Sequence, residues 1–462
     1  MAKERILNMS ISKLIDIKFR NYALYVLMNR GIPSFYDSLT PIQRYILMNT
    51  PQNFTKTLSV VGRVIEDGYH HGSMSVESSI ARLARPYANS HQILEGYGFF
   101  GNEVTPEPSA ARYTSVKLNS EISNIIKEYH YLHTKTDDHY DPLWIDIPIG
   151  LLIPIIGIAV GYKTMILPRK LKDIQDFLNG KRKTVKPYFN NYKGKITKYK
   201  NKDNTWLLTA NVEIKNKTIK VNNLPPIIKY SSLLNKLQHL LNQYDNKINL
   251  INTSDTTINF EIIYKGLKIS EFEEIVEYIK KITSIIVTEN IVFVKDEQVL
   301  VYSNLEEYLE DYKWQIYRLK FENSKYLQNK ISFDLEYNKA KKKFITFILQ
   351  KKRSIDEINT FLKQFNIDIS NKLDRLTSKS FSSTELIKVT ELIKKLTKEL
   401  SSIKKETIKL EKEFNKLKDP TEKRGIKSRQ SSTFNLFEED NNEIDGIEIY
   451  QEEINSTIEE DI

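Results

Sequence analysis

Two short stretches carry the residues best suited to chemistry. Residues 68–72 read Gly-Tyr-His-His-Gly, and an Arg-Tyr pair, Arg112-Tyr113, follows about forty residues later. A tyrosine oxygen can act as a nucleophile, an arginine can pair with phosphate oxygens, and a histidine can donate or move a proton. An Arg-Tyr pair alone is more often structural, since the chain has 26 tyrosines and Arg44-Tyr45 is a second such pair.

Two further motifs accompany these stretches. Residues 95–102 are glycine-rich, which suits a loop whose backbone passes close to another segment. Residues 151–161 form an apolar run broken by proline and glycine. In their order along the chain, the four motifs resemble those of the DNA-cleaving subunit of type II DNA topoisomerases, the family of gyrase A and topoisomerase IV A. The wording and the chain length are most similar to the phage members, and the resemblance covers roughly residues 20–418.

The resemblance implies roles for individual residues. Tyr113 is expected to be the nucleophile that forms a 5′-phosphotyrosyl link, Arg112 its catalytic neighbour, and Arg30 and His71 supporting residues of the same pocket. Ile158 matches an isoleucine that the family inserts between base pairs, although from its apolar surroundings alone we would assign it to the core. Further DNA contacts are expected from His70, Arg44, Arg82 and Arg85.

Composition limits the class of protein. A chain of 462 residues is too long for one compact core, and the absence of cysteine excludes disulfides and thiolate metal sites. The first residues show no hydrophobic signal region. Residues 147–161 are too short and too rich in proline for a membrane span, which needs roughly 20 residues, so we expect buried strand and turn there. We expect a cytoplasmic protein without membrane contact.

The charge of the chain is unevenly distributed. The formal net charge is +10, but residues 438–462 hold 11 acidic residues and no Lys or Arg, so the preceding part carries +21. A body this basic attracts a polyanion such as duplex DNA. The alternative is that the many Lys and Asn residues reflect an AT-rich genome.

The predicted fold class is α+β and multidomain. We expect an N-terminal arm (1–20), a winged-helix cleavage domain (21–143), a tower-like α/β domain (144–303), a coiled coil with a small helical dimerisation gate (304–418), and a disordered acidic tail (419–462). Within the second of these, helices are predicted at 21–29, from Thr40-Pro41 onward through a capping box, at 56–66 and at 73–83. The last of them holds Arg82 and Arg85 at or just past its end and is the expected groove-binding helix.

Strands and heptads organise the remainder. Predicted strands cover residues 205–212, 218–221, 257–264 and 291–294. The clearest heptad seam runs through Leu386, Val389, Ile393, Leu396, Leu400, Ile403, Thr407, Leu410, Phe414 and Leu417, in a helix expected to be capped by residues 382–385. A looser matching seam is predicted at Leu309, Tyr312, Ile316, Leu319 and Tyr326, with Asn323 as a polar gap, and the two helices should form an antiparallel coiled coil around a small knot at 350–381.

Two expected groups have no evident site in the sequence. There is no GxxxxGK[ST] loop for ATP and no evident acidic cluster for catalytic magnesium. In the family both lie on a partner subunit of the ATPase/TOPRIM type, so the resemblance implies a homodimer within a heterotetramer or larger assembly. Two other interpretations remain open: a non-catalytic DNA-binding architectural protein on the same scaffold, and an enzyme that cuts a single strand through tyrosine.

Overall fold

The computed structural model describes residues 10–135, 140–244, 246–296, 298–377, 380–416 and 419–420. These residues form a mixed α and β fold within one compact unit, Met1–Gly425, which confirms the predicted fold class. The division into five domains stays a prediction. The predicted acidic tail beyond residue 420 and Leu417 of the heptad seam lie outside the described residues.

The first helix begins earlier than predicted. Helix α1 spans Ile11–Val26 and runs directly into a π-helical turn, η1, at Leu27–Gly31. Ser10 caps α1 by accepting a hydrogen bond from the Lys13 N–H, and the helix takes up residues 11–20, half of the expected N-terminal arm. The turn η1 places Arg30 at its end, just before buried Ile32.

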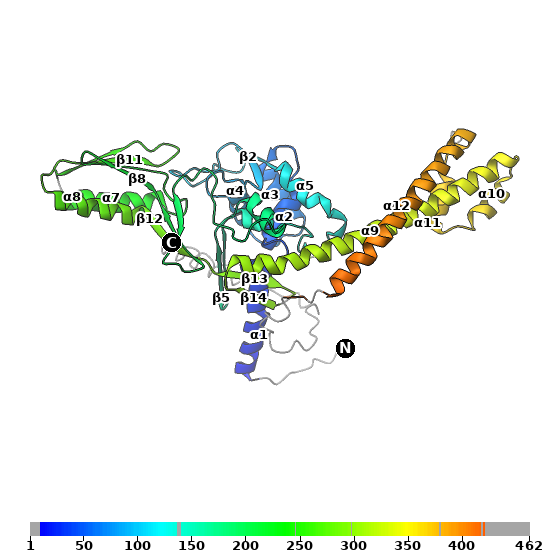
Figure 1. Cartoon of the computed structure of the whole chain (residues 1–462), viewed down its shortest axis with the longest axis horizontal. Helices are drawn as coiled ribbons and strands as arrows, with labels where there is room; N and C mark the ends of the chain where they lie inside the picture. The colour runs from blue at the N-terminus through cyan, green and yellow to red at the C-terminus, as the bar shows by residue number, and fades with distance from the viewer. Residues whose placement is uncertain are drawn as a thin grey trace, which may run out of the picture. The chain divides into compact units, whose positions relative to one another are not determined.

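Three short helices and a small sheet follow, as expected for a winged-helix module (Figure 1). The helices are α2 (Pro41–Asn49), α3 (Thr57–Glu66) and α4 (Ser73–Ala84). The strands are β1 (Thr55–Lys56), β2 (Leu94–Tyr97) and β3 (Ser115–Leu118), arranged antiparallel in the order β1-β3-β2. The predicted start of α2 is confirmed, because the Gln43 side chain accepts a hydrogen bond from the Thr40 N–H at 2.9 Å.

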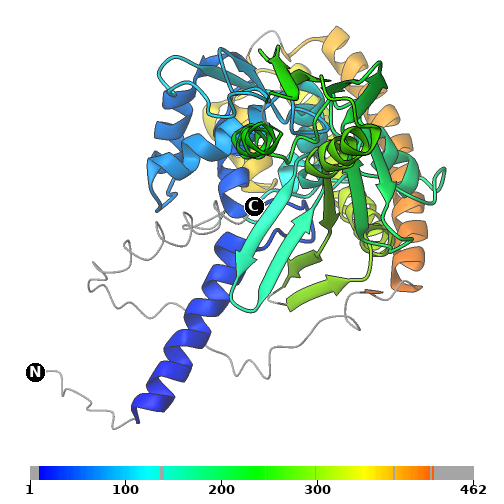
Figure 2. The ribbon, with the colours of Figure 1, turned by 90° about the vertical axis from the view of Figure 1, so that its left-hand side faces the viewer.

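The apolar run near residue 155 is only partly buried, which corrects the prediction of a wholly buried segment. After α5 (Ser120–Glu128) and η2 (His130–Leu132), the chain forms the 3-10 turn η3 (Ile149–Leu152), whose residues are buried. It then forms the hairpin of β4 (Ile155–Ala159) and β5 (Tyr162–Ile166), seen as two paired strands in Figure 2. The alternating residues Ile156, Ile158 and Val160 are exposed, because one face of this two-stranded hairpin has no covering layer.

Helix α6 (Leu171–Leu178) leads into two further sheets. One has the strand order β12-β7-β6 and the other β10-β11-β9-β8, all antiparallel. Helices α7 (Tyr230–Gln243) and α8 (Ile269–Ile282) pack their apolar faces against the second sheet. The strands are β6 (Lys195–Lys198), β7 (Thr205–Thr209), β8 (Asn211–Lys215), β9 (Thr218–Asn222), β10 (Ile248–Asn252), β11 (Asn259–Tyr264) and β12 (Ser284–Thr288).

The predicted strand at 205–212 is two strands. It breaks at buried Ala210, whose N–H donates to the Thr283 carbonyl, and the chain passes from one sheet to the other. The predicted strands at 218–221 and 291–294 match β9 and β13 (Ile291–Lys295), and β13 pairs with β14 (Gln298–Tyr302). The predicted strand at 257–264 is β11, which begins at Asn259.

The predicted antiparallel helix pair is confirmed. Helix α9 (Leu305–Gln350) and helix α12 (Ser383–Lys416) contact each other with opposite directions, since Trp314 and Phe321 lie against Phe414 whereas Lys341 pairs with Glu385 at 2.8 Å. The short helices α10 (Ile355–Leu362) and α11 (Ile367–Asp374) form the predicted knot. Ser382 caps α12 by accepting from the Glu385 N–H.

The heptad seam predicted for α9 does not form the surface that contacts α12. Leu309 and Tyr312 are buried in the core built by residues 35–185, and Tyr326 stacks on Tyr131 with ring centroids 3.8 Å apart. Helix α9 therefore carries two apolar stripes, one that packs into the core and one that contacts α12. The stripe that the sequence pattern marks is the one that packs into the core. Among the described residues no helix is long and apolar enough to cross a membrane.

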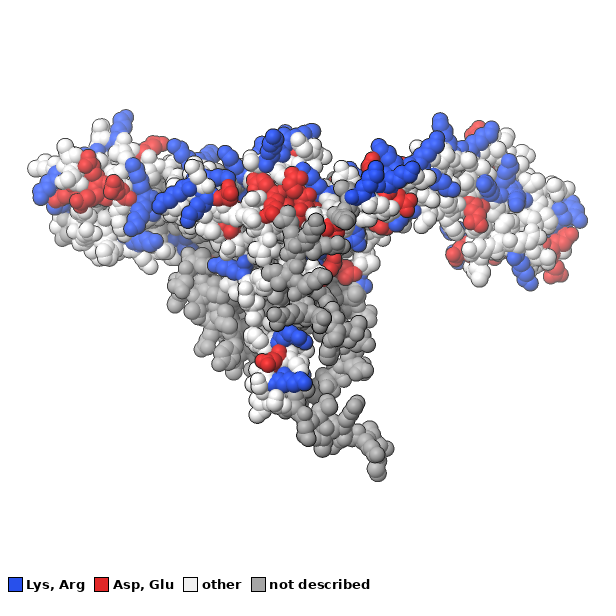
Figure 3. Space-filling view, turned by 60° about the horizontal axis from the view of Figure 1, so that its bottom comes forward, with Lys and Arg blue, Asp and Glu red and all other residues white. Residues whose placement is uncertain are grey.

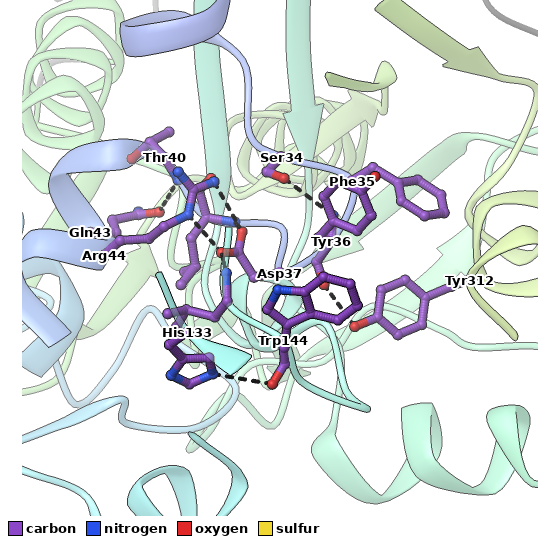
Figure 4. A network of polar contacts seen from close by, with 12 residues as sticks. Ser34, Phe35, Tyr36, Asp37, Thr40, Gln43, Arg44, His133, Trp144 and Tyr312 are labelled. Carbon is purple, nitrogen blue, oxygen red and sulfur yellow. Dashed lines mark hydrogen bonds and ion pairs between the residues drawn. The ribbon is translucent and has the colours of Figure 1, made fainter. Parts of the chain in front are cut away.

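The loop at residues 33–40 joins these parts through a buried carboxylate, Asp37 (Figure 4). Asp37 accepts hydrogen bonds from the Arg44 guanidinium at 2.6 Å, from the Leu39 N–H at 2.8 Å and from the Leu143 N–H at 2.9 Å. From α9, the Tyr308 hydroxyl donates to the Phe35 carbonyl and the Tyr312 hydroxyl lies 2.7 Å from the Tyr36 carbonyl.

Asp37→Asn should reduce the free energy of unfolding by about 3–5 kcal/mol, because it leaves the Arg44 charge buried without its counterion. Urea denaturation followed by tryptophan fluorescence measures this change. Asp203→Asn is the matched control, since Asp203 pairs with Lys198 at the surface and such pairs contribute little. Equal effects of the two substitutions would contradict the assigned role of Asp37.

Candidate functional site

Tyr113 is exposed on a loop whose neighbouring residues are fixed. Its side chain is 69% exposed, whereas Ala111 and Thr114 on either side are buried. The Ala111 and Thr114 carbonyls accept from the Leu58 and Thr57 N–H groups, and the Thr114 hydroxyl donates to the Thr57 hydroxyl at 2.8 Å. The phenol therefore projects from a rigid base into solvent, where a large polymeric substrate can reach it.

Residues 98–102 of the glycine-rich stretch form the predicted loop and lie against the base of Tyr113, whereas residues 95–97 belong to β2. The Ser109 N–H donates to the Phe99 carbonyl at 3.0 Å. Gly98 has a φ of 103°, and a Cβ there would lie 3.4 Å from the Tyr113 carbonyl oxygen. A side chain at this position would be strained by its backbone conformation.

Arg112 lies beside the phenol. Its guanidinium carbon is 5.3 Å from the centroid of the Tyr113 ring, and the side chain is exposed. A guanidinium in this place can pair with two oxygens of a phosphate that approaches the tyrosine oxygen.

Arg30 and His71 form a second pair. The Arg30 Nη2 donates to the His71 Nδ1 at 2.9 Å. Because arginine has no acceptor, Nδ1 must be the unprotonated nitrogen, and Nε2 carries the proton of the neutral ring. Burial, followed by the charges of Arg30 and His70, lowers the pKa of His71 from its usual 6.5. His71 is therefore a neutral hydrogen-bond donor near pH 7.

The two pairs are separate within one chain. In the described structure no hydrogen bond, ion pair or ring contact links Arg30 or His71 to Arg112 or Tyr113. The turn that carries His71 has its own supports: Tyr69 packs edge-on against His71 and Tyr45, with ring centroids 5.0 and 5.6 Å apart. Just before it, Asp67 accepts from Asn49 and Tyr140. The sequence offered no signal for Asp67, because Tyr140 is 73 residues away.

The residues predicted to contact DNA differ in their exposure and in their partners. Ile158 is 45% exposed on the β4–β5 hairpin, and His70 and Arg82 are also exposed. Arg85 is half-buried and donates to the Pro106 carbonyl at 3.1 Å, so its guanidinium supports the chain leading to Tyr113. Arg44 is corrected: it is 5% exposed and its donors bind Asp37 and the Leu39 carbonyl, which leaves this side chain structural.

Two cavities differ in their relation to these residues. A hollow of about 220 Å³ lies between α4 and the Tyr113 loop and is lined in part by Met74, Ser78, Arg85 and Ser109. A larger cavity of about 710 Å³, lined by residues of α6 and α9 among others, contains none of the predicted site residues. Among the described residues, no group of three or more His, Asp or Glu side chains is placed to hold a metal ion.

Comparison with known proteins identifies both the fold and the family of this chain. The chain shares the fold of the Plasmodium falciparum topoisomerase II DNA-binding, cleavage and re-ligation domain, with a TM-score of 0.71 and 21% identity over 87% of this chain and 63% of that one. The model of the DNA gyrase/topoisomerase IV family, for the A subunit, matches residues 30–425. The chain therefore belongs to the family of the DNA gyrase and topoisomerase IV A subunits.

Individual relatives are similar over shorter stretches. The DNA topoisomerase medium subunit of Enterobacteria phage T4 is 30% identical over 204 residues, which are 41% of this chain and 46% of the relative. The DNA gyrase A subunit of Borreliella burgdorferi is 30% identical over 188 residues, 38% of this chain and 23% of the relative. The matched stretches thus cover less than half the length of these curated relatives.

The Arg30–His71 pair makes the titration of His71 testable. Replacing Arg30 with Gln should raise the pKa of His71 toward 6.5, because one of the two charges that disfavour the imidazolium is removed while burial remains. NMR titration of histidine-labelled protein measures it, with His71→Asn assigning the signal among the seven histidines. Arg353→Gln is the control, and a pKa that stays equal or falls in Arg30→Gln would contradict the pairing.

Proposed function

We propose that this chain is the DNA cleavage and religation subunit of an ATP-dependent type II DNA topoisomerase. The observation that carries the proposal is the exposed Tyr113 with Arg112 against it, on a rigidly held loop, in a chain of this family. In this function two copies each cut one strand of a duplex, and a second duplex passes through the break.

The chemistry requires a transfer that conserves the phosphodiester bond. The Tyr113 oxygen attacks a backbone phosphate and loses its proton; a new P–O bond forms to tyrosine as the bond to the 3′ oxygen breaks, and that oxygen leaves with a proton as a 3′-hydroxyl. The product is a 5′-phosphotyrosyl link, and reversal restores the strand. Because an ordinary phenol is protonated near neutral pH, attack needs a base or a nearby positive charge.

The two pairs divide the work in this proposal. Arg112 pairs with the phosphate oxygens and stabilises the charge that develops in the transition state. His71 donates its Nε2–H to the phosphate, and Arg30 holds the tautomer that makes this possible. Arg30 Nε is buried and makes no hydrogen bond within the described structure. A homodimer provides two such sets, one for each strand.

DNA contact is supported by the hairpin and by the charge. The exposed Ile158 suits an apolar wedge that partly unstacks a base step and bends the duplex. Figure 3 shows groups of Lys and Arg side chains on one face, with acidic side chains between them. His70 and Arg82 are exposed and complete the proposed contacts.

The proposal places the remaining chemistry on a partner. ATP and Mg²⁺ are assigned to a subunit of the ATPase/TOPRIM type, within a heterotetramer or larger assembly in the cytoplasm. The assembled enzyme relaxes or decatenates DNA and does not introduce negative supercoils. The second candidate is a non-catalytic architectural protein. The exposed Ile158 and the basic surface also fit such a protein, but it would have no use for the Arg112–Tyr113 pair.

Tyr113→Phe should abolish covalent attachment to DNA 5′ ends and leave duplex affinity nearly unchanged, because only the nucleophilic oxygen is lost. The measurement is the yield of protein–DNA adduct in the presence of Mg²⁺ and the partner subunit. Tyr97→Phe is a matched control, since Tyr97 is 71% exposed on neighbouring β2. Adduct from Tyr113→Phe would refute the assignment, and no adduct from the unmodified enzyme would favour the architectural protein.

The purified chain alone should bind duplex DNA with an affinity that falls steeply as salt rises, because phosphate contacts release counterions. Without its partner it should neither hydrolyse ATP nor pass strands. A filter-binding series across salt concentrations and an ATPase assay check both statements. ATP hydrolysis by the isolated chain, or net supercoiling of relaxed plasmid by the assembled enzyme, would contradict the corresponding part of the proposal.

A further inference from the structure

Two glycines far apart in the sequence are in direct backbone contact. A Cβ built on Gly157 would lie 1.8 Å from the Gly31 carbonyl oxygen, and a Cβ on Gly31 would lie 2.4 Å from the Ile158 carbonyl oxygen. No side chain fits at either position without moving main chain. The peptide that carries Ile158 therefore rests on the peptide that follows Arg30.

The surroundings fix this contact from both sides. Leu27 and Ile32, which bracket Arg30, are buried in one apolar cluster with Ala159 and Tyr162 of the hairpin. Behind the hairpin, Met165 of β5 exchanges two backbone hydrogen bonds with Asn290, at 3.0 and 2.9 Å. A force on the hairpin is thus passed to residues 27–32, since packed main chain has little room to absorb a shift.

The two ends of this connection are sites that the proposed function uses. The Ile158 side chain is exposed together with Ile156 and Val160, on the alternate positions of β4 and the turn that follows it. At the other end the Arg30 guanidinium donates to His71 Nδ1 and keeps a buried Nε without a hydrogen bond in the described structure. One peptide, Gly157–Ile158, separates the wedge from the segment of Arg30.

We propose that the Gly31–Gly157 contact couples insertion of Ile158 into DNA to the position of Arg30 against His71. This inference rests on the proposed function and deepens it. Gly31 and Gly157 are positioning residues: they touch no reacting atom, but they allow a bent duplex to set the guanidinium where the scissile phosphate is bound. An unbent duplex leaves Arg30 out of that position, so cleavage is limited to DNA that accepts the bend.

The first test uses hydrogen exchange of the full-length chain bound to a short DNA duplex. In the unmodified chain the duplex should slow amide exchange in residues 27–32 as well as in 155–159. In Ile158→Ala, with the duplex raised to a concentration that saturates the variant, the slowing in residues 27–32 should be lost. Equal slowing of residues 27–32 in both proteins would overturn the coupling, and this result is independent of whether the chain cleaves DNA.

The second test separates bending from positioning. Gly157→Ala should lower the yield of covalent adduct roughly 100-fold, because a shift of about 1 Å at a reacting centre costs that much. The pH profile of adduct formation by this variant should have its acid limb at higher pH, because displacement of Arg30 from His71 lets the pKa of His71 rise. Gly62→Ala is the control, since a Cβ at Gly62 meets nothing within 4 Å.

A duplex that is already bent by an unpaired bulge completes the design. It should restore adduct formation to Ile158→Ala but not to Gly157→Ala. Rescue of both variants, or a Gly157→Ala variant as active as Gly62→Ala, would overturn the proposal. If Gly157→Ala fails to fold, as judged by circular dichroism, the exchange comparison on Ile158→Ala decides. Absence of adduct from the unmodified enzyme would count against the proposed function instead.

Discussion

A buried charge, the Asp37 carboxylate, joins three segments of the described fold. Burying a carboxylate is costly unless its oxygens are paired, and here Arg44 and two backbone N–H groups supply the partners. The donors come from α2, from the loop itself and from residue 143, so the charge holds three segments together. The same loop presents its carbonyls to Tyr308 and Tyr312. The base of the long helix α9 is thereby fixed to the module that carries the candidate site.

The loop that holds Asp37 also fixes the chain next to Arg30, one of the candidate site residues. The Pro33 carbonyl accepts from the Val294 N–H, and Ser34 forms a bridge with Val294, immediately after the segment of Arg30. Arg30 therefore lies between two fixed segments, the loop of residues 33–40 and the β4–β5 hairpin. Tyr113 has different supports, since its loop is fixed by Thr57, Leu58 and Phe99. The two pairs of site residues are anchored independently, and an event that moves one need not move the other.

Local signals in the sequence predicted local structure well. The capping residues at Thr40 and Ser382 and the strands predicted at 218–221 and 291–294 depend on neighbours a few positions away, and the structure confirms them. Arg44 was misjudged because its burial depends on Asp37 and on the covering segment near Leu143. Helix α9 was misjudged because two stripes overlap on one helix. Ile158 looks like core in the sequence, and only the missing second layer over its hairpin exposes it.

The electrostatic design of the two pairs follows from opposite requirements. A nucleophile for a polymer must stand in solvent, and a phenol on an exposed loop meets that condition with a cation beside it. A neutral histidine donor needs the reverse, because only partial burial and a neighbouring guanidinium keep the imidazole uncharged with its proton on Nε2. One environment cannot satisfy both, so separate supports for the two pairs are physically reasonable. In the proposed function, a DNA phosphate is the group on which both pairs act.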